Sequence, residues 1–194
     1  MDELVTQRLR LRRFTSLDED NLVELDGDPA VMRYLTGGSP TPRAVIRNEI
    51  LPLFMSADPK APSLGFWAAE PLAEREFLGW FSLRLDADES DSASLGYRLK
   101  KRVWGQGFAT EGSRALIRAA FAEGHIERLR ATTYEDNAAS ISVMQKLGMR
   151  FARSYRMTDD DLQAVDTSRT EDVERFPGLD VEYVLERSDW PEHR

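Results

Sequence analysis

The sequence predicts a single α/β (α+β) domain over residues 1–194. The length suits one hydrophobic core of ordinary size, and no linker rich in Pro, Gly or Ser divides the chain. Segments in which apolar and polar residues alternate, the pattern of half-buried strands, are interspersed with segments of helical spacing that begin at capping residues. The composition, 41% hydrophobic and 31% charged, is typical of a soluble globular protein.

Composition and charge exclude several classes of protein. No apolar run approaches the roughly twenty residues that cross a bilayer, and Met1-Asp2-Glu3 does not begin a signal peptide, so we expect a cytoplasmic protein without a membrane partner. The absence of cysteine excludes disulfides and a cysteine nucleophile, and the presence of only two histidines argues against a metal site or a catalytic triad. A net charge of −8 opposes nucleic-acid binding and suits a cationic partner.

The first part of the chain shows a strand pattern followed by helix signals. Leucine and arginine alternate between Thr6 and Phe14, which predicts the first strand. Ser16 followed by Glu19 has the spacing of a capping box, so a helix is expected to begin there. A second helix is expected over residues 43–55, with Pro42 suited to its first position.

Strand patterns recur on both sides of the central part of the chain. Residues 64–70 and 77–85 read as two strands joined by a polar hairpin loop. Gly79 inside the second strand indicates a bulge or the close approach of a neighbour. Further strands are expected over residues 128–134, 151–157 and 181–185.

The most informative stretch is a strand that runs through a glycine-containing turn into a helix. Leu95, Tyr97 and Leu99 alternate with Gly96, Arg98 and Lys100, and the chain then turns tightly at Gly105 and Gly107. Small and apolar residues up to Phe121 mark one helix face, with Thr110 as the expected cap and Glu111 in the first turn. Such a junction directs backbone N–H groups and the positive end of a helix dipole at one place, where phosphate binds readily.

Three phosphate-binding patterns compete for this turn. A Walker loop, G-x-x-x-x-G-K-[ST], occurs nowhere in the chain. The dinucleotide fingerprint G-x-G-x-x-G matches poorly, because its third small position is Thr110 and the acidic Glu127 opens its strand instead of closing it. The third pattern, R/Q-x-x-G-x-G/A, is matched at every defined position by Arg102-Val103-Trp104-Gly105-Gln106-Gly107.

This third pattern resembles the pyrophosphate loop of the GNAT acetyltransferase superfamily, and the wider run from Tyr97 to Glu111 resembles its RimJ/RimL-like branch. Residues 28–35 resemble a DPxVMRYL turn of the same branch, so a turn is expected there. A second segment, Asn137 to Met149, resembles the N-x-x-S…K-x-G-[FM] helix of the same branch, at the distance that one helix and one strand would fill. The resemblance implies a GNAT fold: a mixed, mostly antiparallel sheet of about seven strands, with helices on both faces and two central strands splayed apart.

The resemblance also implies the ligand. It makes acetyl-CoA the cosubstrate, with its diphosphate on the bare amides of the turn and its pantetheine arm along the free edge of the central strand. The implied cofactor-binding residues are Tyr97, Arg98, Leu99, Arg102, Val103, Trp104, Gly105, Gln106, Gly107, Phe108, Ala109, Thr110, Asn137, Ser140 and Lys146.

Three residues are implied in the chemistry. The backbone N–H of Leu99 would stabilise the oxyanion of the tetrahedral intermediate. Many GNAT enzymes protonate the departing thiolate with a tyrosine, but the corresponding residue here is Met144. Ser140 is the substitute that the RimJ/RimL-like branch suggests, with Asn137 orienting the cofactor's amides, although both residues equally suit the first turn of a helix.

The acceptor is less well defined by the sequence. A primary amine must lose a proton before it attacks, and Glu135, Asp136 and Glu70 are candidate bases, none of them distinguished from an ordinary surface acid. Residues 159–180 hold eight acids and two arginines, a local balance of −6 that suits either a solvated loop or a lip that attracts amines.

The expected function is acetyl transfer to a protein N-terminus, or alternatively to a small amine of the polyamine or aminoglycoside type. A non-catalytic acyl-CoA-binding module and a nucleotide-binding α/β domain remain open, and a homodimer is common among the relatives that the resemblance suggests.

Overall fold

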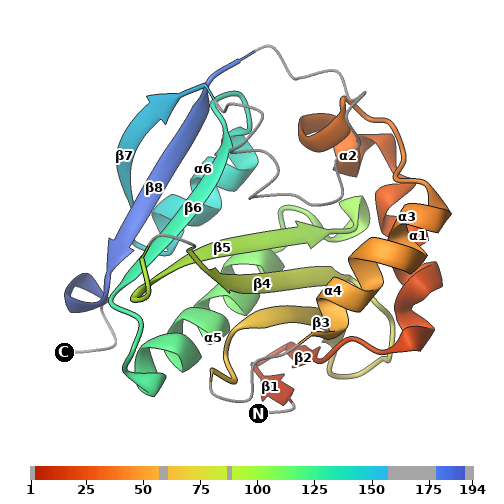
Figure 1. Ribbon diagram of the computed structural model, residues 1–194, viewed down its shortest axis with the longest axis horizontal. Coiled ribbons are helices and arrows are strands. Elements are labelled where there is room, and N and C mark those ends of the chain that lie inside the picture. Colours follow the sequence, from red (N-terminus) through yellow and green to blue (C-terminus); the bar gives the residue numbers. More distant parts are fainter. Residues whose placement is uncertain (1–2, 57–60, 87–88, 157–177, 191–194) are drawn as a thin grey trace.

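The computed structural model describes residues 3–56, 61–86, 89–156 and 178–190. These residues form an eight-stranded sheet in the order β1-β2-β3-β4-β5-β6-β8-β7 (Figure 1). Neighbouring strands are antiparallel except β5 and β6, which are parallel. The strands are β1 (Glu3–Val5), β2 (Leu9–Arg12), β3 (Gly65–Pro71), β4 (Gly79–Leu85), β5 (Ser92–Leu99), β6 (Arg128–Tyr134), β7 (Arg150–Tyr155) and β8 (Asp180–Glu186).

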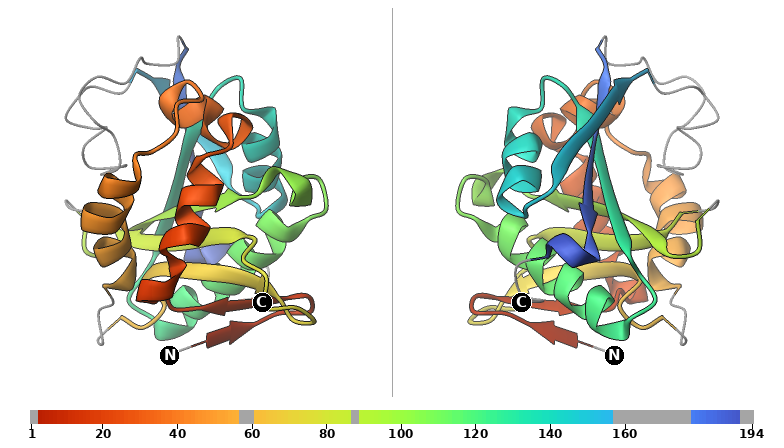
Figure 2. Two further views of the ribbon diagram at one scale, coloured as in Figure 1. Left: turned by 90° about the vertical axis from the view of Figure 1, so that its right-hand side faces the viewer. Right: turned by 90° about the vertical axis from the view of Figure 1, so that its left-hand side faces the viewer.

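Helices cover both faces of this sheet, as predicted (Figure 2). One face carries the helices that follow β2, and the other carries the two helices that flank β6 in the sequence. The first group is η1 (Ser16–Asp18), α1 (Glu19–Asp26), α2 (Pro29–Thr36), α3 (Arg43–Val45), η2 (Ile46–Ile50) and α4 (Leu51–Met55), and the second is α5 (Phe108–Glu123) and α6 (Ala138–Lys146). Two short helices remain: η3 (Lys101–Val103) joins β5 to the glycine turn, and η4 (Arg187–Asp189) follows β8.

The N-terminal strand differs from its prediction. The structure has two strands, β1 and β2, where the sequence predicted one, because the chain reverses at Thr6, whose N–H donates to the Leu9 carbonyl at 2.8 Å. β1 has only three residues and Val5 on it is 59% exposed, so it lacks the apolar alternation that reveals a strand. This short strand is the difference between the seven strands expected and the eight observed.

Two helix starts also differ from their predictions. The capping box is formed by Thr15 and Asp18, one residue before the predicted pair Ser16 and Glu19. Residues 28–35, predicted as a turn, belong to helix α2, whose N-cap Asp28 accepts a hydrogen bond from the Ala30 N–H at 2.8 Å. The predicted helix over residues 43–55 is helical throughout, but its middle part, η2, is a π-helix.

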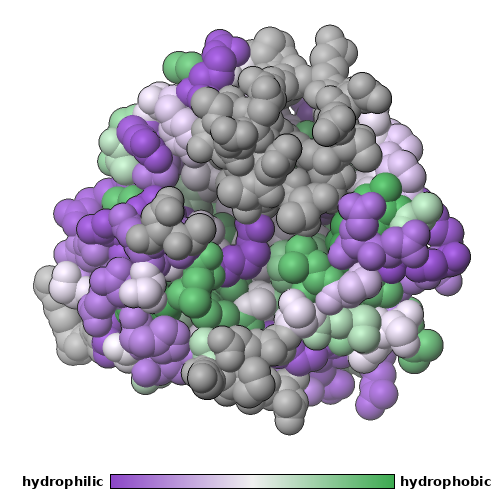
Figure 3. Space-filling model, in the orientation of Figure 1, coloured by the Kyte–Doolittle hydropathy of each residue, from purple (hydrophilic) through white to green (hydrophobic). Residues whose placement is uncertain are grey.

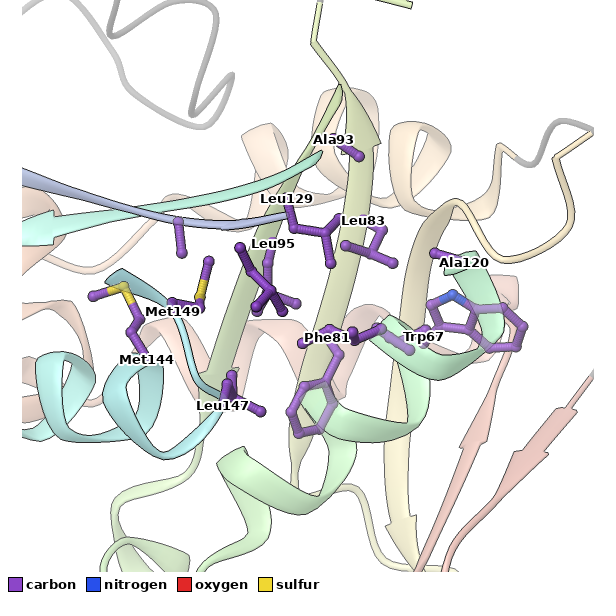
Figure 4. Packing of buried hydrophobic residues seen from close by; sticks show 14 of the residues in the cluster. Trp67, Phe81, Leu83, Ala93, Leu95, Ala120, Leu129, Met144, Leu147 and Met149 are labelled. Atoms are coloured by element: carbon purple, nitrogen blue, oxygen red, sulfur yellow. The ribbon is translucent and has the colours of Figure 1, made fainter. Parts of the chain in front are cut away.

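The core has two parts, one on each face of the sheet. The larger cluster lies between the sheet and helices α5 and α6 (Figure 4). The smaller lies between the sheet and the N-terminal helices, where Phe54 stacks on Phe66 with ring centroids 3.8 Å apart. Gly112 lets α5 approach the sheet closely, since a Cβ there would lie 2.3 Å from the ring of Phe81. These contacts fix α5, and with it the glycine turn that precedes it, against the sheet.

Gly79 is required by close packing between β4 and β5, one of the two alternatives that the sequence left open. Its φ is +138°, and a Cβ would lie 2.1 Å from the carbonyl oxygen of Arg98. Gly79→Ala is therefore expected to lower the free energy of unfolding by about 3 kcal/mol or more, measured by urea denaturation. Gly105→Ala is the control, because its Cβ would meet no atom within 4 Å, and it should cost about 1–2 kcal/mol. Equal losses in the two variants would contradict this explanation.

Candidate functional site

The parallel strands β5 and β6 separate after a short paired section. Their register joins Ser92, Ala93 and Ser94 to residues 128–130, and β5 then continues to Leu99 while β6 continues to Tyr134 beside β8. Figure 1 shows the two strands diverging, which confirms the predicted splay. The opening between them, bounded by residues 95–99 and 131–134 and here called the fork, gives an extended ligand access to an unpaired edge of β5.

The edge of β5 directs a backbone donor toward the fork. The N–H of Lys100 donates to the Leu78 carbonyl at 2.8 Å, on the β4 side. Because successive N–H groups of a strand point to opposite edges, the N–H of Leu99 points to the fork. The Leu99 carbonyl accepts the indole N–H of Trp104 at 2.8 Å, which ties the strand end to the following turn.

The glycine turn leaves its amides bare, as the sequence predicts. Gly105 and Gly107 have φ values of +72° and +83°, in the left-handed region that favours glycine. Within the part of the chain that the structure describes, the backbone N–H groups of residues 105–110 form no hydrogen bond, and those of Glu111 and later residues bond within the helix. The turn is thus an anion cradle, defined here as the amides of residues 105–110.

The start of α5 corrects one prediction. The helix begins at Phe108 with Gly107 as its N-cap, and no side chain caps it. Thr110, predicted as the cap, is instead the third helical residue, because the left-handed Gly107 lets the helix begin earlier. Glu111 lies in the first turn, as expected. The amides that Thr110 would have satisfied as a cap remain available to a ligand.

Charged and polar side chains around the cradle are partly engaged. Arg102 forms an ion pair with Glu76 at 2.5 Å and is half exposed. Gln106 folds back, its side-chain amide donating to the Arg102 carbonyl at 2.9 Å. Lys146 ends α6, where its carbonyl accepts a hydrogen bond from Arg114 at 3.0 Å. Arg102 thus adjoins the cradle through Gln106, whereas Lys146 is joined to α5 at Arg114, and the amides of residues 105–110 stay uncovered.

Arg98 lies away from the cradle on the other face of the sheet. Its guanidinium donates to Asp26 at 2.6 Å, and Asp26 also accepts the Thr41 hydroxyl at 2.9 Å. Both members of this ion pair are largely buried. The side chain of Arg98 therefore joins β5 to α1, and its backbone groups, like the N–H of Lys100, point to β4, so the structure does not bring Arg98, predicted to bind the cofactor, to the fork.

Asn137 and Ser140 open helix α6 beside the fork. Asn137 is the N-cap, as predicted, and its side-chain oxygen accepts the Ser140 N–H at 3.3 Å while its amide nitrogen donates to Thr133 at 3.0 Å. The Ser140 hydroxyl lies 2.8 Å from the hydroxyl of Tyr97 on β5. Two hydroxyls from elements 43 residues apart in sequence thus meet between β5 and α6.

Tyr97 is a partner that sequence reasoning did not assign to Ser140. Burial, partly offset by the hydrogen bond with Ser140, raises the pKa of Tyr97 to about 12. Met144, at the position where the wider family carries a tyrosine, is only 1% exposed and packs in the core (Figure 4). The tyrosine hydroxyl beside Ser140 therefore comes from Tyr97 on β5, and not from a tyrosine on α6 at the position of Met144. No sequence motif signals this, since the contact depends on how the strand and helix pack.

The raised pKa of Tyr97 predicts a specific alkaline sensitivity. An unfolded tyrosine ionises near pH 10, whereas Tyr97 in the folded protein ionises near pH 12, so between these values the unfolded state binds fewer protons. The contribution of Tyr97 to stability is present below pH 10 and is lost as pH rises toward 12. The stability difference between wild type and Tyr97→Phe, measured by urea denaturation, should shrink between pH 9 and pH 11. A difference independent of pH would contradict the shift.

Helix α2, on the face of the sheet that carries α1–α4, contacts the end of β6. Tyr34 on α2 donates to the Asp136 carbonyl at 3.1 Å, and its ring lies 6.5 Å from that of Tyr134 at the end of β6. Helix α2 is thereby fixed against the open end of the fork. Figure 3 shows polar and apolar residues together at the centre of this face, an environment that suits an amine with an apolar part.

The three candidate bases have different surroundings. Glu70 is buried and paired with Arg12 at 2.7 Å, on β3. Glu135 accepts the Leu179 N–H at 3.0 Å, and Asp136 is exposed just after β6. The structure therefore brings Glu135 and Asp136, but not Glu70, to the end of the fork. Most of the acidic segment 159–180 lies outside the described residues.

Two further findings concern the described residues as a whole. Among them, no three His, Cys, Asp or Glu side chains are grouped so as to hold a metal ion. None of the helices in that part of the chain combines the length and the apolar character needed to cross a bilayer.

Comparisons with known proteins agree with this geometry. Residues 8–150 match the family model described as "Acetyltransferase (GNAT) domain". The chain is 28% identical over 198 residues to the "FsC-acetyl coenzyme A-N(2)-transacetylase" of Aspergillus fumigatus, covering 96% of this chain and 77% of that protein. It is 31% identical over 159 residues to the "Uncharacterized protein YkkB" of Bacillus subtilis, covering 79% and 88% respectively.

Among solved structures, the fold is similar to that of "RimL- Ribosomal L7/L12 alpha-N-protein acetyltransferase in complex with Coenzyme A", with a TM-score of 0.74, 17% identity and coverage of 95% of this chain and 98% of that one. Together with the family model, these comparisons show that the chain belongs to the GNAT acetyltransferase family, whose enzymes transfer the acetyl group of acetyl-CoA to an amine.

Proposed function

We propose that this protein is an N-acetyltransferase of the RimJ/RimL-like branch that acetylates a primary amine, with a peptide N-terminus as the first candidate acceptor. The observation that carries the proposal is the position of the anion cradle, whose bare amides stand at the end of the same strand that borders the fork. A ligand with a diphosphate and an extended arm fits this arrangement, and acetyl-CoA has both.

The cradle and β5 hold the donor in the proposed mode. The amides of residues 105–110 bind the diphosphate, and Arg102 and Lys146 would add positive charge. The unpaired edge of β5 pairs with the amides of the pantetheine arm. When bound, acetyl-CoA supplies a thioester whose carbonyl carbon the amine attacks, so that a C–N bond forms and the C–S bond breaks.

The Leu99 N–H, the Ser140 hydroxyl and a carboxylate act on the reacting atoms in this mode, and two further residues position Ser140. The N–H of Leu99 stabilises the negative charge that develops on the thioester oxygen. The Ser140 hydroxyl donates a proton to the departing sulfur and regains one from solvent after the thiol has formed, while the hydrogen bond with Tyr97 orients that hydroxyl. Asn137 fixes the first turn of α6 that carries Ser140. The proton lost by the amine passes to Glu135 or Asp136, directly or through water.

A small-molecule acceptor is the second candidate, favoured by a specific observation. The relative that covers 96% of this chain is named an N(2)-transacetylase of FsC, whereas the likeness to RimL is one of fold, at 17% identity. Both acceptors present a primary amine, so the donor half of the site is the same for either. The two acceptors would differ in their contacts with the face of the sheet that carries α2.

Thiol release separates these candidates. Purified protein is incubated with acetyl-CoA and, in separate reactions, peptides with free N-termini, polyamines and aminoglycosides. The proposal predicts amine-dependent release of CoA with at least one class, and the preferred class identifies the acceptor. An acyl-CoA-binding module without turnover gives no release above buffer, although CoA raises its melting temperature. Stabilisation by NAD or ATP but not by CoA would favour a nucleotide-binding domain and contradict the proposal.

The organisation as a single domain over residues 1–194, the cytoplasmic location and the formation of a homodimer stay predictions.

A further inference from the structure

The hairpin between β1 and β2 contacts the anion cradle through Arg8. Its Nη1 donates to the Gln106 carbonyl at 3.0 Å, and its guanidinium lies over the ring of Phe108 with 4.3 Å between Cζ and the ring centroid. Its Nε donates to Glu111 at 2.6 Å. A residue about a hundred positions earlier in the sequence is therefore bound to both ends of the cradle.

Glu111 is the second member of this contact. Its Oε1 accepts the Thr6 hydroxyl at 2.6 Å and the Arg8 backbone N–H at 2.8 Å, and its Oε2 accepts the Arg8 side chain. Although burial raises the pKa of Glu111, these hydrogen bonds outweigh it, so that the net pKa lies below the ordinary value and the side chain is a carboxylate. A carboxylate in the first turn of α5 is placed to compete with a phosphate for the helix N-terminus.

The hairpin removes this competition. Because the carboxylate oxygens of Glu111 are occupied by donors from Thr6 and Arg8, the carboxylate faces the hairpin and its charge is balanced by the guanidinium. The bond from Arg8 to the Gln106 carbonyl also fixes the peptide between the two left-handed glycines, which keeps the neighbouring N–H groups on the open side of the turn.

We propose that Arg8 is a positioning residue for the coenzyme's diphosphate: it neutralises Glu111 and holds the peptide at Gln106 so that the amides of residues 105–110 face the ligand. The inference rests on the proposed function, because it concerns the donor half of the same site. It assigns a role in cofactor binding to the hairpin that precedes the acceptor-side helices, a part of the chain with no phosphate-binding motif.

Kinetics of Arg8→Met test this role. The variant should raise the KM for acetyl-CoA and the Kd for CoA, measured by titration calorimetry, about 10- to 100-fold, the effect expected from loss of a charge-assisted hydrogen bond. The kcat at saturating acetyl-CoA should stay within about threefold and the KM for the acceptor should not change, because the fork and α6 are untouched. Arg10→Met is the matched control: it removes the same charge from the same hairpin at a residue paired with Glu3, and should leave both constants unchanged.

Arg8→Lys separates positioning from charge alone. A lysine keeps the positive charge but cannot bond the Gln106 carbonyl and the Glu111 carboxylate together, so its KM should remain raised. Full recovery with lysine, equal effects of Arg8→Met and Arg10→Met, or a fall in kcat and melting temperature with unchanged KM would each overturn the proposal. Wild-type protein that binds no CoA would instead contradict the proposed function, so the two failures are distinguishable.

Discussion

Replacement of Gly105 by aspartate is expected to weaken CoA binding at least about 100-fold. The backbone at this position has a φ of +72°, and a Cβ would meet no atom within 4 Å, so the new side chain stands in the open space over the cradle. Its carboxylate can accept hydrogen bonds from the amides meant for the diphosphate and repels that group by several kcal/mol at a separation of about 4 Å. Titration calorimetry with CoA measures the effect.

Two controls separate charge from backbone strain. Gly105→Asn introduces a side chain of the same size without charge, in a conformation that asparagine tolerates, and should weaken binding less than tenfold. Gly124→Asp adds the same charge at a glycine with a φ of +86° at the other end of α5, about 24 Å away, and should bind CoA like the wild type. If asparagine and aspartate at position 105 act equally, the electrostatic explanation is wrong.

Ser140→Ala is expected to lower kcat by about 10²- to 10⁴-fold while the Kd for CoA changes less than threefold. The range is that of general acid catalysis, because the departing thiolate loses the hydroxyl that would protonate it. Tyr97→Phe should reduce kcat less, since Ser140 remains and loses only its partner at 2.8 Å. Steady-state kinetics of both variants with the acceptor found by thiol release give the comparison.

Ser113→Ala provides the matched control for this substitution. Its hydroxyl is fully buried in α5 and, among the described residues, has no hydrogen-bond partner, so its removal should leave kcat unchanged. A normal kcat in Ser140→Ala would show that Ser140 has no catalytic role. Catalysis would then rest on the positioning of the substrates and on the Leu99 amide. A loss of CoA binding equal to the loss of kcat would make Ser140 a binding residue.

The sequence is most informative where local rules determine the structure. Strand β6 has the predicted bounds, and its first four residues, 128–131, alternate between partly exposed and buried positions as the pattern predicts. Gly105 and Gly107 adopt the left-handed conformations that their spacing predicts, since glycine alone reaches them without strain. The pattern predicts the first capping box one residue too late, because Thr15 with Asp18 and Ser16 with Glu19 both satisfy it. Tertiary contacts select Thr15 and Asp18.

Contacts between different elements of the structure cannot be predicted from such local rules. Asp18 is favoured over Glu19 in the capping box because it also binds Arg12 on β2, a buried ion pair that no local pattern contains. The pairing of Tyr97 with Ser140 and that of Arg8 with Glu111 join segments 43 and 103 residues apart. Their existence depends on how β5 packs on α6 and the β1–β2 hairpin packs on α5, which spacing along the chain does not encode.

The central claim is that the bare amides between Gly105 and Thr110 bind the diphosphate of acetyl-CoA and direct its sulfur into the fork. A crystal structure of the protein with CoA tests it most directly. The account predicts diphosphate oxygens about 2.7–3.2 Å from those amide nitrogens, and the thiol beside the Ser140 hydroxyl between β5 and β6. A diphosphate bound elsewhere, with the amides of the turn facing solvent, would contradict it.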